Sequence, residues 1–480
     1  SQGLTEKDKL YTDFHPEGKM LVFGKLEGFR SRPKANGTHT SIALDIIRIA
    51  ADQGIVIEDR LHKPVMGGWE PIQNIITEYL KPTHSIDELK MLRATDSFIS
   101  HIYKHLSDED KEDIHTVPVS VAINGYPEVP NVDAQKFTTS GGHGFPGPKK
   151  AHVTIDEKRN EWERYREYSP EVMASVERIV EKALKGERTH PIFTTQLKDE
   201  MVSLKKLLAA KTRGFYMCPL DYLTAIRMFT LGIARVMVRR RDLFRNAVGL
   251  NTHSEEWNEI YEEAARITGD NWVAGDFVGF DKILSILIQN FTKRVFLAVA
   301  RMGGFSDAEL LALDTLISDN ITAVVDFFGT LVMLLGGEVS GHQLTTFFNS
   351  VANIILHAYA WCVIYGEEDM DLFWDKVFIR VLGDDIMAKV HPDYPEYNHS
   401  TIQAVFASIG IDYTMADKSS ETRPYIPSTE VTFLKRSFRT HSEFPLMVVA
   451  PLELNSIWKM LLYTIPSKSV SPEEQLAQSI

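Results

Sequence analysis

The stretch Phe378-Ile-Arg-Val-Leu-Gly-Asp-Asp-Ile-Met-Ala-Lys-Val390 decides the fold, because two short apolar, β-prone runs flank Gly383-Asp384-Asp385. Glycine at the break suits a tight hairpin turn, since it tolerates the positive φ that such turns need. A strand interior would point the two Asp side chains to opposite faces, whereas a turn lets both approach one site. Two adjacent carboxylates raise each other's pKa and are costly unless a cation binds there. Taken alone, the pattern is more typical of a solvated surface turn.

A second acidic cluster lies about a hundred residues upstream, in Trp272-Val-Ala-Gly-Asp276-Phe-Val-Gly-Phe-Asp281. The apolar run predicts a strand that ends at Asp276, and Asp281 follows on the turn into a helical stretch over 284–300. Strand-end carboxylates from two separate segments could grip a pair of Mg²⁺ ions roughly 4 Å apart, the arrangement used for in-line phosphoryl transfer. The alternative for Asp276 is an N-cap of the next helix.

The third element is the segment 336–350, which reads Gly-Gly-Glu-Val-Ser-Gly-His-Gln-Leu-Thr-Thr-Phe-Phe-Asn-Ser. Ser340-Gly341 predicts a flexible, hydroxyl-bearing start to a helix that reaches about Ile364. Thr345 and Asn349 are four residues apart and therefore share one helix face. A polar pair in an apolar helix needs partners, which are either a local side-chain network or a sugar hydroxyl.

These three elements, in this order, resemble motifs A, B and C of viral RNA-dependent RNA polymerases of the picornavirus-like group (Picornavirales). The family pattern is Asp-x4-Asp, then Ser-Gly-x3-Thr-x3-Asn, then Gly-Asp-Asp. The matching residues are, in chain order, Asp276 and Asp281, then Ser340-Gly341, Thr345 and Asn349, then Gly383-Asp384-Asp385. The combined signal is specific, because three spacings and their order would all have to arise by chance.

Further segments extend the resemblance over roughly residues 136–440. The segment 410–418 resembles motif D, whose lysine, here Lys418, is the expected general acid. The segment 431–436 resembles motif E, the primer grip, and places Leu434 and Lys435 against RNA. Thr139-Ser140-Gly141 belongs to a looser match to motif G, which lies on the template path. The basic residues that resemble motif F, which lines the nucleotide channel, are Lys198, Lys206 and Arg213.

The resemblance implies a role for each of these residues. Asp276 and Asp384 would hold two metal ions, Mg²⁺ or alternatively Mn²⁺, with Asp385 as a nearby support. Asp281 and Asn349 would contact the ribose 2′-hydroxyl, which separates RNA from DNA precursors. Ser340 and Thr345 would orient that network, and Lys198, Lys206 and Arg213 would meet the triphosphate. Lys418 would protonate the leaving pyrophosphate, although by itself it is more typical of a surface lysine.

The resemblance also implies the fold, an α+β right-hand polymerase with fingers, palm and thumb. The palm is expected to carry a ferredoxin-like antiparallel sheet flanked by helices. The predicted subdomains are fingers over 1–231, palm with motif A over 232–283, a return to the fingers over 284–336, palm with motifs B to E over 337–440, and a short or truncated thumb over 441–480.

Composition agrees with an enzyme of this size. The 480 residues, 44% of them hydrophobic, can bury a large core, and the net charge of −13 argues against a general nucleic-acid-coating protein. A polymerase needs only a locally basic channel, and the segment 198–245 is rich in basic residues. Its run Arg239-Arg240-Arg241 could equally be a solvated helix end. Acidic runs such as 108–113 are most simply solvated faces.

Local patterns predict several further elements. Amphipathic patterns predict helices over 41–53, 68–79, 85–105 and 168–185, and Val117–Val121 predicts an edge strand. The segment 321–335 is nearly apolar but short, and we interpret it as a buried helix, so that no transmembrane segment is expected.

The two cysteines, Cys218 and Cys362, suit a reducing compartment. The family resemblance predicts the host-cell cytoplasm, at viral replication complexes. The chain begins at Ser1 without methionine, which release from a polyprotein, or other processing, would explain.

The sequence thus predicts a polymerase that copies viral RNA. Its expected partners are template and primer RNA, NTPs, a viral protein primer and other replication proteins. Two alternatives stay open. A reverse transcriptase shares the palm carboxylates but usually carries an aromatic residue in its Asp-Asp motif, and it would select dNTPs. A catalytically silent RNA-binding replication protein could keep the fold without the chemistry.

Overall fold

The computed structural model describes residues 19–27, 34–57, 61–79, 85–126, 129, 132–160, 163–339, 341–342, 344–417, 421–467 and 470–478. Two of the predicted site residues, Ser340 and Lys418, lie outside these described residues.

The Gly-Asp-Asp stretch forms the predicted hairpin. Strand β12 (Val377–Leu382) pairs with β13 (Asp385–Val390), so that only Gly383 and Asp384 form the turn. Gly383 has φ +63°, a conformation that glycine adopts without the steric cost other residues would meet. The turn leaves Asp384 exposed at its tip and places Asp385 at the first position of β13.

The hairpin belongs to a four-stranded antiparallel sheet with the order β12-β13-β9-β14. Strand β9 (Trp272–Phe277) carries Asp276, as predicted, and β14 (Tyr413–Met415) is the edge strand from motif D. In chain order these strands alternate with the helices α15 (Leu344–Tyr365) and α17 (His399–Ser408) as β9-α15-β12-β13-α17-β14. This is the split βαβ order of a ferredoxin-like sheet, which confirms the expected topology.

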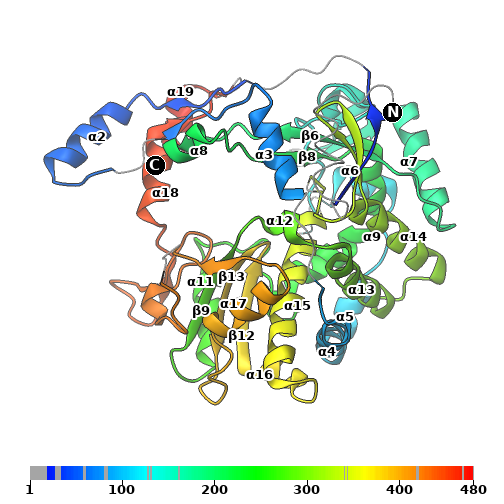
Figure 1. The fold of residues 1–480 in the computed structure, drawn as a ribbon. Helices are drawn as coiled ribbons and strands as arrows, with labels where there is room; N and C mark the ends of the chain where they lie inside the picture. The colour runs from blue at the N-terminus through cyan, green and yellow to red at the C-terminus, as the bar shows by residue number, and fades with distance from the viewer. Residues whose placement is uncertain are drawn as a thin grey trace.

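A second sheet has five strands in the order β1-β11-β10-β6-β8. It combines β1 (Met20–Lys25), β6 (Ile192–Leu197) and β8 (Gly214–Met217) with β10 (Val324–Phe327) and β11 (Thr330–Leu334). Only β10 and β6 pair in parallel. Three distant parts of the chain therefore meet in one sheet, seen above the four-stranded sheet in Figure 1.

The predicted buried helix over 321–335 is wrong, because most of this segment is the β10–β11 hairpin. Phe328 and Gly329 both have positive φ and make a two-residue turn between the strands. A short apolar run fits a buried strand as well as a buried helix, and periodicity alone does not separate them.

The predicted strand Val117–Val121 is also wrong, since the chain forms helix α6 (Val119–Asn124) with Pro118 as its N-cap residue. Proline has a fixed φ that suits a helix start, and at this position its missing N–H costs no helical hydrogen bond.

The helices predicted over 41–53, 68–79, 85–105 and 168–185 are confirmed as α2 (Ala43–Asp52), α3 (Glu70–Tyr79), α4 (Glu88–His105) and α7 (Pro170–Ala183). The other α-helices are α5 (Asp108–Asp113), α8 (Leu204–Leu208), α9 (Leu220–Arg239), α10 (Arg241–Phe244), α11 (Glu256–Ala265), α12 (Phe280–Ile283), α13 (Ile286–Met302), α14 (Asp307–Ile321), α16 (Phe373–Lys376), α18 (Leu454–Leu462) and α19 (Pro472–Ala477). In the described part of the chain, the short 3₁₀ helices are η1 (Lys149–His152), η2 (Met370–Leu372) and η3 (Ser428–Glu430). Two-stranded pairs are formed by β2 (Thr38–His39) with β17 (Tyr463–Thr464), β3 (Leu61–His62) with β7 (Val202–Ser203), β4 (Val153–Lys158) with β5 (Arg164–Tyr168), and β15 (Arg439–Thr440) with β16 (Val448–Val449).

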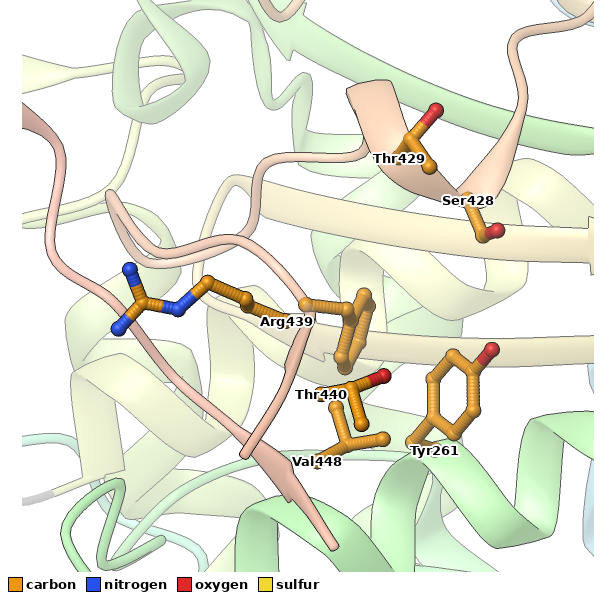
Figure 2. A pocket seen from close by; sticks show the side chains of 7 residues that line it. Tyr261, Ser428, Thr429, Arg439, Thr440 and Val448 are labelled. Atoms are coloured by element: carbon orange, nitrogen blue, oxygen red, sulfur yellow. The ribbon is translucent and has the colours of Figure 1, made fainter. Parts of the chain in front are cut away.

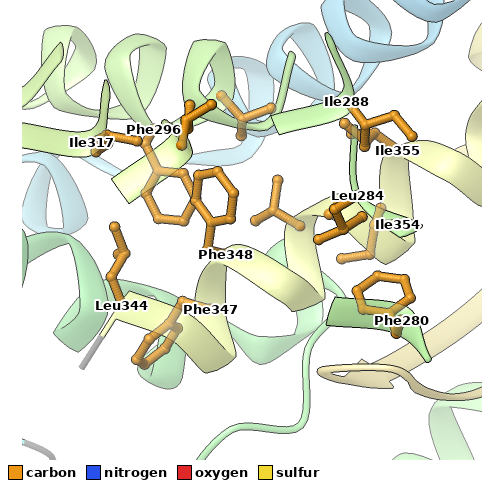
Figure 3. Packing of buried hydrophobic residues seen from close by; sticks show 14 of the residues in the cluster. Phe280, Leu284, Ile288, Phe296, Ile317, Leu344, Phe347, Phe348, Ile354 and Ile355 are labelled. Atoms are coloured by element: carbon orange, nitrogen blue, oxygen red, sulfur yellow. The ribbon is translucent and has the colours of Figure 1, made fainter. Parts of the chain in front are cut away.

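Helix α15 forms the centre of the hydrophobic core. Figure 3 shows its Phe348 beside Phe296 of α13 and its Ile354 above Phe280 of α12, and Phe348 stacks on Phe296 with ring centroids 5.8 Å apart. Fully burying each such side chain contributes about 1.5–3 kcal/mol. This helix is the one candidate for a membrane span among the described residues, by length and composition only. Because 83% of its apolar window is buried inside the protein, α15 has the character of a core helix.

The last part of the chain returns to the first. Strand β17 pairs with β2, and the Thr40 N–H donates to the Leu462 carbonyl (3.0 Å). Ala43, Leu462 and Tyr463 form a small buried cluster there, so that α18 lies near α2 on one side of the molecule (Figure 1). The subdomain boundaries drawn from the sequence, including the extent of the thumb, stay a prediction.

Candidate active site

The carboxylates of motifs A and C come from neighbouring strands. In the β13–β9 pair Ile386 lies opposite Gly275, and continuing this register by one residue places Asp385 opposite Asp276. Side chains directly opposite each other on antiparallel strands have Cβ atoms about 4.5–5.5 Å apart and share one face. The fold therefore gathers Asp276, Asp384 and Asp385 at one end of the four-stranded sheet.

The carboxylates at this end of the sheet repel one another. Burial raises the pKa of Asp385 to about 6, and the negative charges of Asp384 and Asp276 add to the shift. The pKa of Asp384 is also raised, first by the surrounding protein that displaces water and then by Asp276 and Asp281. Neither Asp384 nor Asp385 makes an ion pair with a described residue. A bound cation would relieve this repulsion.

Two side chains of α15 hold the Gly-Asp-Asp turn in place. The Ser350 hydroxyl accepts a hydrogen bond from the Gly383 N–H (2.9 Å), and the Asn353 amide donates to the Gly383 carbonyl (3.0 Å). Neither residue was predicted as part of the site. For Asn353 the available signal was its position four residues after Asn349 on one helix face, because a polar residue in an apolar helix needs a buried partner.

Motif E reaches the same carboxylates through its backbone. Leu434 and Lys435 both have positive φ and form a tight turn between Phe433 and Arg436. The Leu434 N–H donates to the Asp385 carboxylate (2.8 Å), which lowers the pKa of Asp385 against the larger effect of burial. The predicted residues Leu434 and Lys435 are thus beside the acidic site, with the exposed Lys435 ammonium 3.7 Å from Glu453.

Motifs A and B face each other across a small buried polar region. Asp281 lies in α12, and Thr345 and Asn349 lie in the first turns of α15. The Thr345 hydroxyl and the Asn349 carbonyl oxygen are buried without a hydrogen-bond partner among the described residues. Buried polar groups are nearly always paired, so these two atoms are open to a ligand, and the expected contact with a sugar hydroxyl stays a prediction.

Motif F lies where β6 ends and β8 begins. The Lys198 N–H donates to the Arg213 carbonyl (2.8 Å), which closes the end of this strand pair. The exposed Arg213 guanidinium makes a 3.5 Å ion pair with Glu200 and lowers the pKa of Asp384, so it lies within electrostatic range of the turn. Lys198 and Lys206 make no ion pair with a described residue, and no contact joins them to the carboxylates.

The residues matched to motif G form a separate, well-bonded loop. The buried Lys149 ammonium donates to the Thr139 hydroxyl (2.6 Å) and to the Ser140 carbonyl (2.9 Å). The Gly141 N–H donates to the Gly147 carbonyl (2.9 Å). The structure shows no contact between this loop and the carboxylates, so the expected template contact stays a prediction.

The donor set fits a divalent cation. Among the described residues no three His, Cys, Asp or Glu side chains are close enough together to hold a metal by themselves. Mg²⁺ is usually held by one or two carboxylates plus substrate phosphates and water, so a complete protein cage is not required. Oxygen-only ligands suit Mg²⁺ or Mn²⁺ rather than softer metals.

A pocket of about 360 Å³ lies elsewhere, between α11, η3 and the β15–β16 pair (Figure 2). Its lining includes Tyr261, Ser428, Thr429 and Arg439 and contains none of the predicted site residues. The pocket is therefore not the predicted catalytic centre.

A ferredoxin-like sheet that presents opposed carboxylates beside a Gly-Asp-Asp turn is the catalytic architecture of template-directed polymerases of the right-hand class. A sequence model of the family described as viral RNA-dependent RNA polymerase matches residues 59–479, nearly the whole chain. The chain belongs to this family, whose members are nucleotidyltransferases that make RNA on an RNA template.

The relatives are polyproteins of viruses of the picornavirus-like group, which confirms the resemblance inferred from the motifs. The genome polyprotein of Rice tungro spherical virus (strain A) is 26% identical over 86% of this chain and 12% of its own length. The replicase polyprotein of Drosophila C virus (strain EB) is 23% identical over 97% of this chain and 27% of its own length. The chain thus spans about an eighth to a quarter of the length of these relatives.

A solved structure supports the fold independently. The Sicinivirus 3Dpol RNA-dependent RNA polymerase superposes with a TM-score of 0.73 and 18% sequence identity. The match covers 92% of this chain and 88% of that one. The α+β right-hand architecture expected from the motifs is therefore confirmed.

Proposed function

We propose that this chain synthesises RNA from NTPs on a viral RNA template, in genome replication and transcription, by two-metal nucleotidyl transfer. The observation that carries the proposal is the pairing of β13 with β9, whose register, continued by one residue, places Asp385 opposite Asp276, with raised pKa values at Asp384 and Asp385. Such crowding of carboxylates disfavours the metal-free protein and is relieved when cations bind.

Asp276 and Asp384 would hold the two ions, Mg²⁺ or alternatively Mn²⁺, with Asp385 in support. When bound, the ions lower the pKa of the primer 3′-hydroxyl and neutralise the triphosphate and the leaving pyrophosphate. The protein keeps the carboxylates in position through the Ser350 and Asn353 contacts with Gly383 and through the Leu434 N–H on Asp385.

The nucleotide would be bound by groups from several motifs. Asp281 and Asn349 would contact the ribose 2′-hydroxyl, with Thr345 and Ser340 orienting them. Arg213, Lys198 and Lys206 would meet the triphosphate, and the effect of Arg213 on the pKa of Asp384 supports its part in this role. Lys418 would supply the proton to pyrophosphate.

RNA would run past Thr139, Ser140 and Gly141 on the template side and past Leu434 and Lys435 on the primer side. A viral protein primer and further replication proteins would join it in the host-cell cytoplasm, at viral replication complexes. The relatives support this setting because they are viral polyproteins, one of them described as a replicase.

The test is incorporation of labelled NTPs on a primed RNA template with Mg²⁺ or Mn²⁺, comparing the wild type with Asp384→Ala. Metal-dependent extension that the variant loses, while it still binds RNA, supports the proposal. Extension from dNTPs in preference to NTPs would instead identify a reverse transcriptase. RNA binding without extension by either protein would identify a catalytically silent replication protein.

A further inference from the structure

Glu338 is a buried acid that the predicted catalytic machinery does not use. It lies between β11 and the motif B helix, and its side chain is fully buried. Neither carboxyl oxygen has a hydrogen-bond partner among the described residues. An acid buried in this way costs several kcal/mol in general, so such residues are kept mainly where they serve a function.

The main chain of Glu338 is tied to motif A. Its N–H donates to the Asp281 carbonyl (2.6 Å), and the Gly337 N–H donates to the Leu284 carbonyl (2.7 Å). The Gln289 amide then donates to both the Leu284 and the Gly337 carbonyls, each at 3.0 Å. The backbone around Glu338 is thus fixed to the same short helix that carries Asp281.

The side chain of Glu338 faces motif B. Burial raises the pKa of Glu338 well above its ordinary value, and the charge of Asp281 raises it further. The Asn349 amide, which approaches the carboxyl without completing a hydrogen bond of good geometry, acts in the opposite direction. One residue therefore contacts motif A through its backbone and approaches the motif B asparagine through its side chain.

The surroundings leave little freedom for this segment. Tyr79 packs so closely that a Cβ on Gly337 would lie 2.6 Å from the tyrosine ring. The Tyr79 hydroxyl shares a hydrogen bond with that of Tyr216, and Glu338 and Asp281 both raise the pKa of Tyr79. No cation pairs with the Glu338 carboxyl among the described residues, so the nearby polar group that it can orient is Asn349.

We propose that Glu338 is a positioning residue for sugar selection, whose buried carboxyl orients the Asn349 amide while its backbone N–H fixes Asp281. The two residues then meet a ribose 2′-hydroxyl together, with the unpartnered Asn349 oxygen as acceptor. This inference rests on the proposed polymerase function, which supplies the nucleotide substrate. Glu338 itself does not touch the substrate.

The test measures kcat/KM for an NTP and for the matching dNTP on a primed RNA template, with Glu338→Met and Glu338→Gln. Methionine has similar volume but leaves the Asn349 amide without a polar neighbour, so the NTP preference should fall about tenfold. Glutamine keeps an acceptor oxygen and should restore a preference close to that of the wild type. Because methionine removes an unpaired buried acid, Glu338→Met should be as stable as the wild type or more stable.

A double-mutant cycle with Asn349→Ala makes the inference specific. The effect of Glu338→Met on the NTP preference should vanish when Asn349 is already absent, because the two residues act as a unit. Asp110→Asn, which alters a buried acid paired with arginines of another region, is the matched control and should leave the preference unchanged.

The outcomes separate the two proposals. A wild type that incorporates no nucleotide overturns the proposed function. An active Glu338→Met with an unchanged NTP preference, or with lowered stability as its only change, overturns the role of Glu338 alone. The role of Glu338 is also overturned if Glu338→Met lowers the NTP preference equally in the presence and absence of the Asn349 side chain.

Discussion

Two acidic clusters in this molecule have opposite environments. Asp110, from the acidic run of α5, is 3% exposed and pairs with Arg239 and Arg240, while Asp113 pairs with Arg235 and Arg239. Burial alone would raise the pKa of Asp110, but the hydrogen bonds from Arg239 and Arg240 outweigh it and lower the pKa. At the Gly-Asp-Asp turn, water displaced by the surrounding protein and then neighbouring carboxylates raise the pKa of Asp384 and Asp385.

The difference lies in the partners. The α5 carboxylates are paired with arginines inside the protein, so they stabilise the fold and have no need of a ligand. At the turn, Asp384 raises the pKa of Asp385 and Asp276 raises the pKa of both, so the site gains from an external cation. These two clusters therefore differ in the direction of their pKa shifts, and the following predictions test whether the paired cluster is structural and the crowded one catalytic.

The largest expected effect is on catalysis at the turn. Asp276→Asn should lower kcat by about a thousandfold or more, because catalytic groups that act as a unit typically contribute on that scale. Its free energy of unfolding without metal should stay the same or rise, since one charge of the crowded site is gone. Primer extension and urea unfolding measure the two quantities. A stability loss that accounts for the lost activity would contradict the assignment.

The next effect is on stability at α5. Asp110→Asn should lower the free energy of unfolding by about 1–3 kcal/mol, because it leaves two partly buried arginines without their charged partner. Activity per folded molecule should not change. If fully folded Asp110→Asn lost activity, the α5 cluster would not be purely structural, and the contrast with the carboxylates of the turn would fail.

The same variant gives a pH test. The pKa of Asp110 is lower in the folded state than its ordinary value of about 3.9 in the unfolded chain. The ionised carboxylate therefore contributes to the free energy of unfolding above about pH 3.9, and this contribution is lost as the pH falls through the folded pKa. Urea unfolding at pH 7 and pH 3 should show the gap between the wild type and Asp110→Asn shrinking in acid. A constant gap would mean that the ion pairs do not stabilise the fold.

A smaller effect is expected from the side chains that hold the turn. Ser350→Ala leaves the Gly383 N–H without its acceptor, which should cost about 1–2 kcal/mol and lower kcat about tenfold with little change in KM. Thr346→Ala, one turn earlier on the same helix, serves as the control. Equal kinetics in the two variants would show that the Ser350 contact does not position the carboxylates.

The smallest effect is expected at the exposed end of the site. Lys435→Ala loses a 3.7 Å ion pair with Glu453 that is largely open to solvent, so stability should change by less than about 1 kcal/mol. If Lys435 contacts an RNA phosphate, the salt dependence of RNA binding should become shallower by about one charge. If the salt dependence of RNA binding did not change in Lys435→Ala, Lys435 would not contact an RNA phosphate.

Much of the site could be predicted because its signals are local. The hairpin at Gly383, the strand that ends at Asp276 and the α15 face that carries Thr345 and Asn349 follow from turn chemistry and periodicity within short windows. The spacing of these residues then indicated the family of viral RNA-dependent RNA polymerases. The structure places Asp276 and Asp385 on neighbouring strands with Asp384 on the adjoining turn, and the roles of these residues and of Asp281 stay predictions.

The rest depended on contacts between distant segments. The β10–β11 hairpin was mistaken for a helix, because a sheet partner such as β6 is invisible in a short apolar run. Asp110 was expected on a solvated face, and Arg239–Arg241 were expected either in a basic channel or at a solvated helix end. Arg239 and Arg240 instead pair with Asp110, and Arg241 pairs with Glu256. Glu338 and Ser350 could not be predicted as site residues, because their roles depend on the distant residues that they contact.

The most direct test of the central claim is a Mn²⁺ titration, followed by electron paramagnetic resonance, of protein bound to an NTP and a primer that ends in a 3′-deoxynucleotide. The wild type and Asp110→Asn should bind two ions at this site, and Asp384→Asn should bind fewer or bind them more weakly. Unchanged Mn²⁺ binding in Asp384→Asn, or a loss of binding in Asp110→Asn, would contradict the account.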